Sequence, residues 1–151
     1  MKKAFTMVEL VFVIVILGIL AAVAIPKLAV TRDDAVITKG QSQVSAIRSG
    51  IALQKSKRLL EGSITPLPNL DSVTNYNNDN QRLFNFNDGN TSNVLECPIY
   101  SQQNHDGSWV KTGANAYAYR VNGAATAFTY DSTNGLFSCT TGTASCDVLT
   151  R

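Results

Sequence analysis

The chain has 151 residues, enough for one domain with a single modest core. Its net charge is only +2, but the charge is unevenly distributed: seven Lys and Arg face three acidic residues over 27–61, whereas four face seven over 62–151. A nucleic-acid surface needs clustered positive charge at the contact face. The basic segment 27–61 followed by the acidic segment 62–151 therefore argues against a nucleic-acid partner.

The first predicted element is an apolar helix long enough to cross a membrane. No charged residue occurs between Leu10 and Pro26, and every residue of 10–25 is apolar or glycine. A full span needs about 20 apolar residues. The segment reaches that length when it is counted from Phe5, at the cost of one embedded charge, Glu9. Two lysines precede it, so we expect the start of the chain to stay cytoplasmic while the rest crosses.

Glu9 decides between two interpretations of this segment. A conventional secretory signal peptide would be cut after Ala24 and would release a soluble protein that begins near Ile25. A carboxylate has no role at the start of the apolar region of such a signal peptide. A charge in hydrocarbon costs about 2.5–3.5 kcal/mol at the bilayer centre, so it usually has a partner. A free α-amino group on a neighbouring chain would serve, and cleavage just before the apolar segment would create one.

The run Lys-Lys-Ala-Phe-Thr-Met-Val-Glu-Leu, followed by the unbroken apolar stretch, resembles the processing motif of type IV pilins and type II secretion pseudopilins. The resemblance implies that a prepilin peptidase cuts between Ala4 and Phe5 and methylates the new amine of Phe5. It also implies that Glu9 guides the subunit into a filament, and that Pro26 kinks the helix. The family usually has glycine before the cut, where this chain has another small residue.

The resemblance also implies a domain organisation and a set of partners. Residues 1–4 would be a prepilin leader, 5–26 a transmembrane and assembly segment, and 27–151 a periplasmic pilin-like head that includes the amphipathic half of the helix. The expected partners are other copies, other pilin-like subunits, the prepilin peptidase, an inner-membrane assembly platform and membrane lipid. The subunit would sit in the bacterial inner membrane as a single-pass protein and then enter a periplasmic or surface filament.

Beyond Pro26 the helical pattern continues and becomes amphipathic. Apolar residues at spacings of 7, 7, 3 and 4 form one stripe: Val30, Ile37, Val44, Ile47 and Ile51. Gly62 is the expected C-cap, and two prolines soon after it prevent continuation. The pattern predicts one helix from about residue 6 to residue 61. We interpret Gly40 and Gly50 as positions of close packing against the head rather than as hinges.

The rest of the chain predicts loops followed by a small sheet. Residues 63–115 read mainly as loops and turns, notably at 75–80 and 88–90. Ala116–Val121 and Thr126–Tyr130 alternate around Asn122-Gly123, a type I′ hairpin signal, and Leu136–Cys139 reads as a third strand. The expected fold is α+β: a long N-terminal helix, transmembrane in its first half, packed against a small C-terminal antiparallel sheet. The resemblance implies the same pilin-like layout.

Three cysteines leave an odd count. Cys139 and Cys146 bracket a short loop and are the candidate disulfide, which would stabilise the fold by roughly 2–3 kcal/mol in the chain-entropy model. Cys97 would then be free, although the two other pairings remain open. The spacing contains no C-x-x-C pair, so the cysteines do not predict a metal site.

No motif in the sequence predicts catalysis. His105 is expected to be a surface loop residue, and neither a nucleophile elbow nor a phosphate-binding glycine loop occurs. Some major pseudopilins hold calcium in a C-terminal loop, which makes Asp131 and Asp147 candidate ligands. No run of oxygen ligands accompanies them, so we expect neither a metal nor another cofactor.

The predicted function is structural rather than enzymatic. We expect a pseudopilin or minor pilin of a type II secretion or type IV pilus-like filament, polymerised through its N-terminal helix. The alternatives are a competence pseudopilin for DNA uptake and a soluble periplasmic binding module released by ordinary signal peptidase. The sequence does not distinguish a major from a minor subunit.

Overall fold

We describe residues 5–85, 93–140 and 144–150 of a computed structural model of the chain, without the side chains of 28–30 and 144. The predicted turn at 88–90 lies outside these residues. The chain divides into two compact units, Met1–Ala35 and Val36–Arg151. The elements in chain order are α1 (Met7–Leu60), β1 (Arg82–Leu83), β2 (Ile99–Tyr100), β3 (Trp109–Gly113), β4 (Ala116–Val121), β5 (Ala124–Asp131), β6 (Leu136–Cys139) and α2 (Ala144–Leu149).

The long helix α1 has nearly the predicted bounds. It ends at Leu60, and Gly62 just beyond it adopts a φ of 85°, a left-handed conformation that glycine tolerates best. The Ser63 N–H donates to the Arg58 carbonyl at 2.8 Å, and the Gly62 N–H donates to the Leu59 carbonyl at 3.1 Å. These two bonds are the Schellman motif, which satisfies carbonyls that the last turn would leave unpaired.

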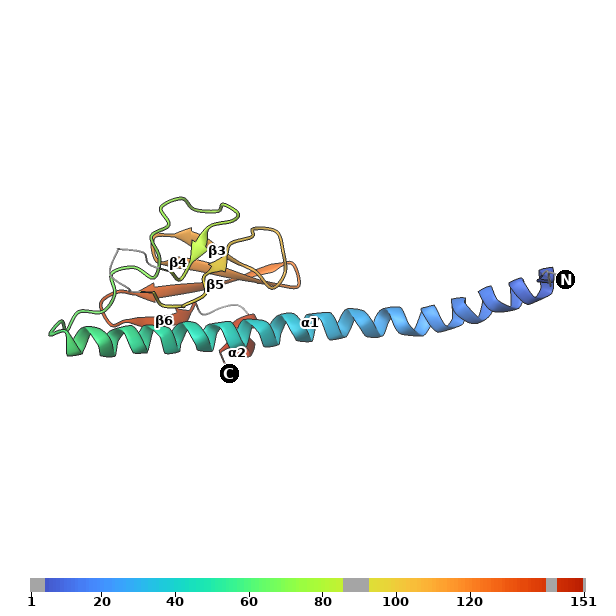
Figure 1. Cartoon of the computed structure of the whole chain (residues 1–151), viewed down its shortest axis with the longest axis horizontal. Coiled ribbons are helices and arrows are strands. Elements are labelled where there is room, and N and C mark those ends of the chain that lie inside the picture. Colours follow the sequence, from blue (N-terminus) through green and yellow to red (C-terminus); the bar gives the residue numbers. More distant parts are fainter. Residues whose placement is uncertain (1–4, 86–92, 141–143, 151) are drawn as a thin grey trace. The chain divides into compact units, whose positions relative to one another are not determined.

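The main sheet is antiparallel, with the strand order β3-β4-β5-β6 (Figure 1). The β4–β5 hairpin turns at Asn122 and Gly123, whose φ angles of 50° and 75° fit the predicted type I′ turn. Strands β4 and β6 have the predicted bounds, and β5 is longer than predicted at both ends. The meander therefore follows from its local sequence pattern.

The prediction of loops over 63–115 was wrong at three short strands. Strands β1 and β2 pair with each other over two residues each, too few to show a period. Strand β3 pairs with β4, and its inward residues are Trp109 and Lys111. A strand is recognised in a sequence by alternating apolar and polar residues. The lysine at an inward position of β3 interrupts this alternation, so the strand was not predicted. The predicted loop between the two cysteines also ends in a short helix, α2.

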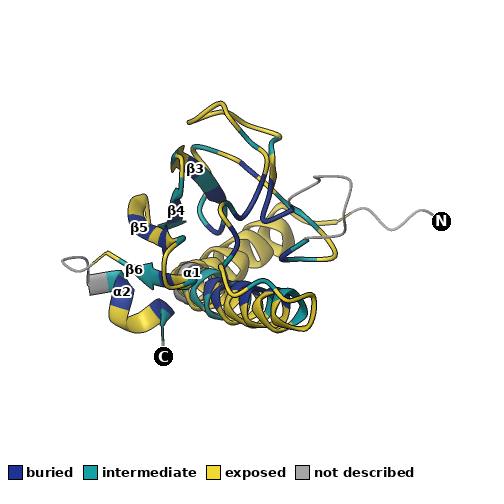
Figure 2. Ribbon diagram, turned by 90° about the vertical axis from the view of Figure 1, so that its left-hand side faces the viewer, coloured by how far each residue is buried: buried dark blue, intermediate teal, exposed yellow. Residues whose placement is uncertain are grey.

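The core of the second unit lies between α1 and the sheet. Val44, Ile47 and Ile51 of the predicted stripe are buried, and Ile37 packs partly buried against them. Figure 2 shows that the buried part of α1 lies on the face that is turned to the rest of the head. The sheet contributes a cluster of buried aromatic side chains: Trp109, Tyr117, Tyr119, Phe128 and Phe137. The stripe prediction is confirmed, except at Val30, whose side chain is outside the description.

Two glycines let α1 approach the rest of the head closely. A Cβ atom at Gly40 would lie 2.5 Å from Cε1 of Tyr119, well inside van der Waals contact. A Cβ atom at Gly50 would overlap the carbonyl oxygen of Val94. The structure thus supports close packing at both positions.

Two side-chain hydrogen bonds join the aromatic cluster to α1. The Tyr119 hydroxyl donates to the Val36 carbonyl at 2.7 Å, and the Trp109 Nε1–H donates to the Gln43 side-chain oxygen at 3.0 Å. Burial raises the pKa of Tyr119 to about 12, and the negative charge of Asp106 adds to the shift. The sheet is therefore tied to α1 by directional contacts as well as by apolar burial.

Both outer edges of the main sheet are engaged. On β3, the carbonyls of Lys111 and Trp109 accept hydrogen bonds from the N–H groups of Asn77, at 2.8 Å, and Gln102, at 3.0 Å. On β6, the Phe137 carbonyl accepts a hydrogen bond from Nε of Arg48 in α1, at 3.3 Å. An exposed edge strand is a template for pairing with another chain, and these contacts occupy that template.

Candidate functional site

The start of α1 is closed by a reciprocal contact between Thr6 and Glu9. The backbone N–H and the hydroxyl of Thr6 both donate to Oε2 of Glu9, at 2.9 and 2.8 Å, and the Glu9 N–H approaches the Thr6 hydroxyl oxygen at 3.3 Å. This is a capping box, in which the N-cap and N3 side chains satisfy backbone donors that the first turn leaves free. The Glu9 carboxylate is thus placed at the helix start by local sequence alone.

The apolar side chains that follow are exposed in the single chain. Large apolar residues are solvent-accessible along α1 from Met7 to Ile25. The helix is long and apolar enough to cross a membrane, judged by length and composition. A contiguous apolar surface of this size needs lipid or protein to cover it.

The predicted processing residues occupy the same end of the chain. Ala4 lies outside the described residues. Phe5 is 84% exposed and stands just before the capping box. Pro26 lies inside α1, where its missing N–H removes one backbone hydrogen bond of the helix.

The cysteines show one pairing. Cys139 and Cys146 form a disulfide with a Cα–Cα distance of 5.8 Å, and Cys97 is a free, exposed thiol. The disulfide links the end of β6 to α2. Leu149 of α2 is buried, so the C-terminal helix is held by a covalent bond and by packing.

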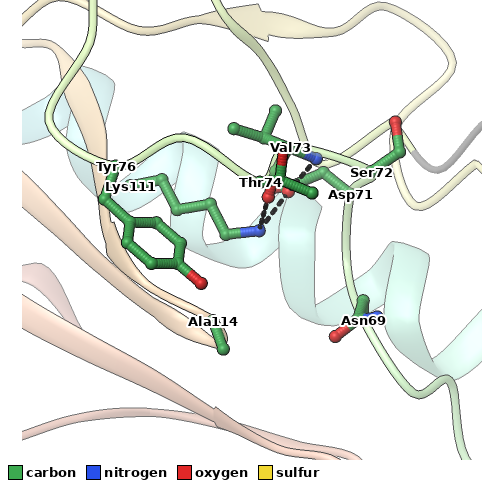
Figure 3. A pocket seen from close by; sticks show the side chains of 8 residues that line it. All are labelled: Asn69, Asp71, Ser72, Val73, Thr74, Tyr76, Lys111 and Ala114. Atoms are coloured by element: carbon green, nitrogen blue, oxygen red, sulfur yellow. Dashed lines mark hydrogen bonds and ion pairs between the residues drawn. The ribbon is translucent and has the colours of Figure 1, made fainter.

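A polar cavity of about 400 Å³ lies beside β3 in the head (Figure 3). Its wall contains a buried ion pair, in which Lys111 Nζ lies 2.6 Å from Oδ1 of Asp71 and also donates to the Val73 carbonyl at 2.7 Å. The Tyr117 hydroxyl donates to the other Asp71 oxygen at 2.8 Å. Burial raises the pKa of Tyr117, and the Asp71 charge adds to the shift. These groups satisfy one another, so the network fastens the loop around residue 71 to the sheet.

The residues weighed for catalysis or metal binding lie apart. His105 is exposed in a loop. Asp131 belongs to the β5–β6 turn, where it accepts hydrogen bonds from Thr133 and Asn134, and the bond from the Thr133 hydroxyl contributes most to lowering its pKa. Asp147 is on α2. Within the described part of the chain, no three His, Cys, Asp or Glu are placed to share a metal ion.

The N-terminal end thus combines an exposed aromatic residue, a capped carboxylate and an apolar helix. Residues 1–25 match the prokaryotic N-terminal methylation motif. This is the prepilin-type motif of type IV pilin-like proteins, and it supports a type IV pilin-like subunit. No curated protein and no solved structure was found to match the chain.

Two contacts in the structure were not predicted from the sequence. Thr6 precedes Glu9 by three residues, the spacing of a capping box, so this contact could have been found from sequence. The contact of Lys111 with Asp71 could not, because the two residues are separated by 40 positions and no local pattern pairs them.

Proposed function

We propose that the chain is a structural subunit, a pseudopilin or minor pilin, of a type II secretion or type IV pilus-like filament. The prepilin motif at residues 1–25, in a helix whose apolar side chains are exposed, carries this proposal. Proteins with this motif are structural subunits rather than enzymes. The exposed apolar surface would be covered first by lipid and then by the same helix of other copies.

Processing would convert the N-terminal end into an assembly device. A prepilin peptidase cuts between Ala4 and Phe5 and methylates the new Phe5 amine. Both hydrogen bonds from Thr6 go to Oε2 of Glu9, so Oε1 can bind the Phe5 amine of a neighbouring copy while the cap is kept. Because a carboxylate in hydrocarbon is costly, gaining this cationic partner favours incorporation over remaining alone in the membrane.

The proposal includes the topology that precedes assembly. Residues 5–26 span the bacterial inner membrane once, the N-terminus faces the cytoplasm, and the head lies in the periplasm, in keeping with the lysines before the span. The partners are then other pilin-like subunits, the peptidase, the assembly platform and lipid. The acidic balance of 62–151 favours this role over DNA uptake. Tight binding of DNA by the full chain in gel shifts at physiological salt would overturn that preference.

The proposal is tested by the mature N-terminus and by Glu9. Mass spectrometry of the membrane-extracted chain should find N-methylated Phe5 as the first residue. Glu9→Ala should leave insertion and cleavage intact and remove the chain from the filament fraction. Thr6→Ala is the matched control, since it removes the cap, worth about 1 kcal/mol, but keeps the carboxylate. A mature chain that begins near Ile25, or normal filaments from Glu9→Ala, would contradict the proposal.

A further inference from the structure

The tip of the β4–β5 hairpin carries a residue pair in which asparagine is chemically labile. In an Asn-Gly pair the glycine nitrogen can attack Cγ of the asparagine side chain, since glycine has no Cβ atom to hinder the approach. The sequence contains this pair twice, at Asn122-Gly123 and at Asn134-Gly135. Both asparagines are exposed, so water and base can reach them. The two turns are therefore candidate sites of deamidation.

Deamidation at the hairpin tip takes two steps. The Gly123 nitrogen loses its proton to base and bonds to Cγ of Asn122, while the Cγ–Nδ2 bond breaks and ammonia leaves with a proton from the solvent. Water then opens the resulting five-membered ring at one of its two carbonyl groups, which leaves aspartate or isoaspartate at position 122. Neither step is a redox step, so water and base are the only co-reactants.

The attacking nitrogen is held in a hydrogen bond to a carboxylate. The Gly123 N–H donates to Oδ1 of Asp106 at 2.9 Å. A hydrogen bond to an ionised oxygen is stronger than one to a neutral oxygen. Loss of the proton would also place an anionic nitrogen beside the carboxylate, which Coulomb repulsion disfavours. Asp106 thus opposes the first step of the reaction.

The backbone next to Asp106 is fixed to β4 and to α1. The Gly107 N–H donates to the Arg120 carbonyl at 2.8 Å, and the Arg120 N–H donates to the Ser108 carbonyl at 3.1 Å. Nζ of Lys39 in α1 donates to the Gly107 carbonyl at 2.7 Å. These contacts keep the Asp106 carboxylate beside the hairpin tip.

The second Asn-Gly pair is held without Asp106. The Gly135 N–H donates to the backbone carbonyl of Asp131 at 2.8 Å, and Nδ2 of Asn134 donates to Oδ2 of Asp131 at 2.7 Å. Both reacting groups of this pair are thus held by a residue of their own turn. Asn134 therefore serves as an internal reference, because a change at Asp106 leaves these contacts in place.

From these contacts we infer that Asp106 protects Asn122 from deamidation, and that the hairpin tip is a modification site once this contact is lost. Asn122 lines a cavity of about 160 Å³ together with Ile37, Val148 and Leu149. A carboxylate at position 122 would lie beside these apolar side chains, and isoaspartate would add a carbon atom to the backbone of a tight turn. The protection therefore preserves the place where α1, α2 and the hairpin meet. This role goes beyond the proposed filament function and does not depend on it.

Ageing of the full chain in mild detergent tests this role. The wild type, Asp106→Ala and Asp131→Ala are incubated at mildly alkaline pH, and aspartate and isoaspartate at positions 122 and 134 are quantified over time by peptide mass spectrometry. Asp106→Ala should raise the rate at Asn122 by about two- to tenfold, the effect of one hydrogen bond, and should leave the rate at Asn134 unchanged. Asp131→Ala is the matched control, because it removes a carboxylate from the other turn and should leave the rate at Asn122 unchanged.

Three outcomes would overturn the inference. Equal rates at Asn122 in the wild type and in Asp106→Ala would show that the hydrogen bond gives no protection. A slower rate in the variant would show that the Asp106 carboxylate promotes the reaction. An equal rise at Asn122 and Asn134 would show a general loosening of the head rather than the loss of one contact. Absence of the chain from filaments would refute the proposed function and leave this test unaffected.

Discussion

Lys111→Met should be among the most destabilising substitutions in the head. It removes the cation from a pair whose side chains are 2% and 0% exposed and leaves the Asp71 carboxylate buried. The Tyr117 hydroxyl and the Val73 N–H remain as its donors, but neither carries a positive charge. Breaking a buried pair from one side costs about 3–5 kcal/mol, against a total stability of about 5–15 kcal/mol for a typical protein.

The measurement uses the only tryptophan of the chain. Trp109 is fully buried, and its ring centroid lies 5.5 Å from that of Phe84, so its fluorescence reports loss of the core. Denaturant unfolding of the full chain in mild detergent gives the free energy of each variant. Lys57→Met is the matched control, because it removes a lysine from an exposed pair with an N–O distance of 4.0 Å, and it should cost less than about 1 kcal/mol.

A double variant sharpens the test of the buried pair. Adding Asp71→Asn to Lys111→Met removes the stranded charge and keeps an acceptor for Tyr117, so it should recover part of the lost stability. The reasoning would be refuted if Lys111→Met cost less than about 1 kcal/mol, the value of an exposed pair. It would also be refuted if the double variant were less stable than Lys111→Met alone.

Three further predictions concern the packing of the head. Gly50→Ala should destabilise it by about 1–3 kcal/mol in denaturant unfolding, because the added Cβ meets the Val94 carbonyl; unchanged or higher stability would show that the two segments separate freely. Cys139→Ser should lower the free energy of unfolding by roughly 2–3 kcal/mol relative to the oxidised chain, and reduction of the wild type should lower it by the same amount. An unchanged free energy of unfolding in both cases would show that the disulfide between β6 and α2 does not stabilise the head. Tyr119 has a raised pKa of about 12, so its contribution is complete below the unfolded value of about 10 and is lost as the pH rises through about 12. Tyr119→Phe should therefore reduce the fall in the free energy of unfolding between about pH 10 and about pH 12. If the variant shows the same pH dependence as the wild type, Tyr119 is not the cause of that fall.

The fold was predictable where one local pattern decided the structure. The stripe through Val44, Ile47 and Ile51 predicted the buried face of α1, and Asn122-Gly123 predicted the hairpin. Strand β3 was missed because its inward Lys111 is made acceptable only by Asp71, a partner distant in sequence. Helix α2 was missed because its position depends on a disulfide and on Leu149 packing, which no short window contains.

The candidate site followed from sequence for a different reason. The prepilin-type motif and the apolar helix are local features, so Glu9 and Phe5 could be selected as candidates without knowledge of the fold, although the capping box at Thr6 was missed. The surface of the head could not be predicted in this way. A groove lined by Arg48, Ile51 and Leu136 depends on the β5–β6 turn lying beside α1. The place of α2 on α1 depends on a hydrogen bond from Gln41 to the Val148 carbonyl, so both features emerge only from tertiary structure.

The contacts along β3 and β6 have a consequence for how the head can associate. Backbone donors from two loops already bind the carbonyls of β3, and Arg48 already binds the Phe137 carbonyl of β6. A second sheet cannot add to either edge without displacing these groups, so strand addition between heads is discouraged. The head is thereby protected from amyloid-like association through its sheet edges, and contact between heads is left to side chains and helices.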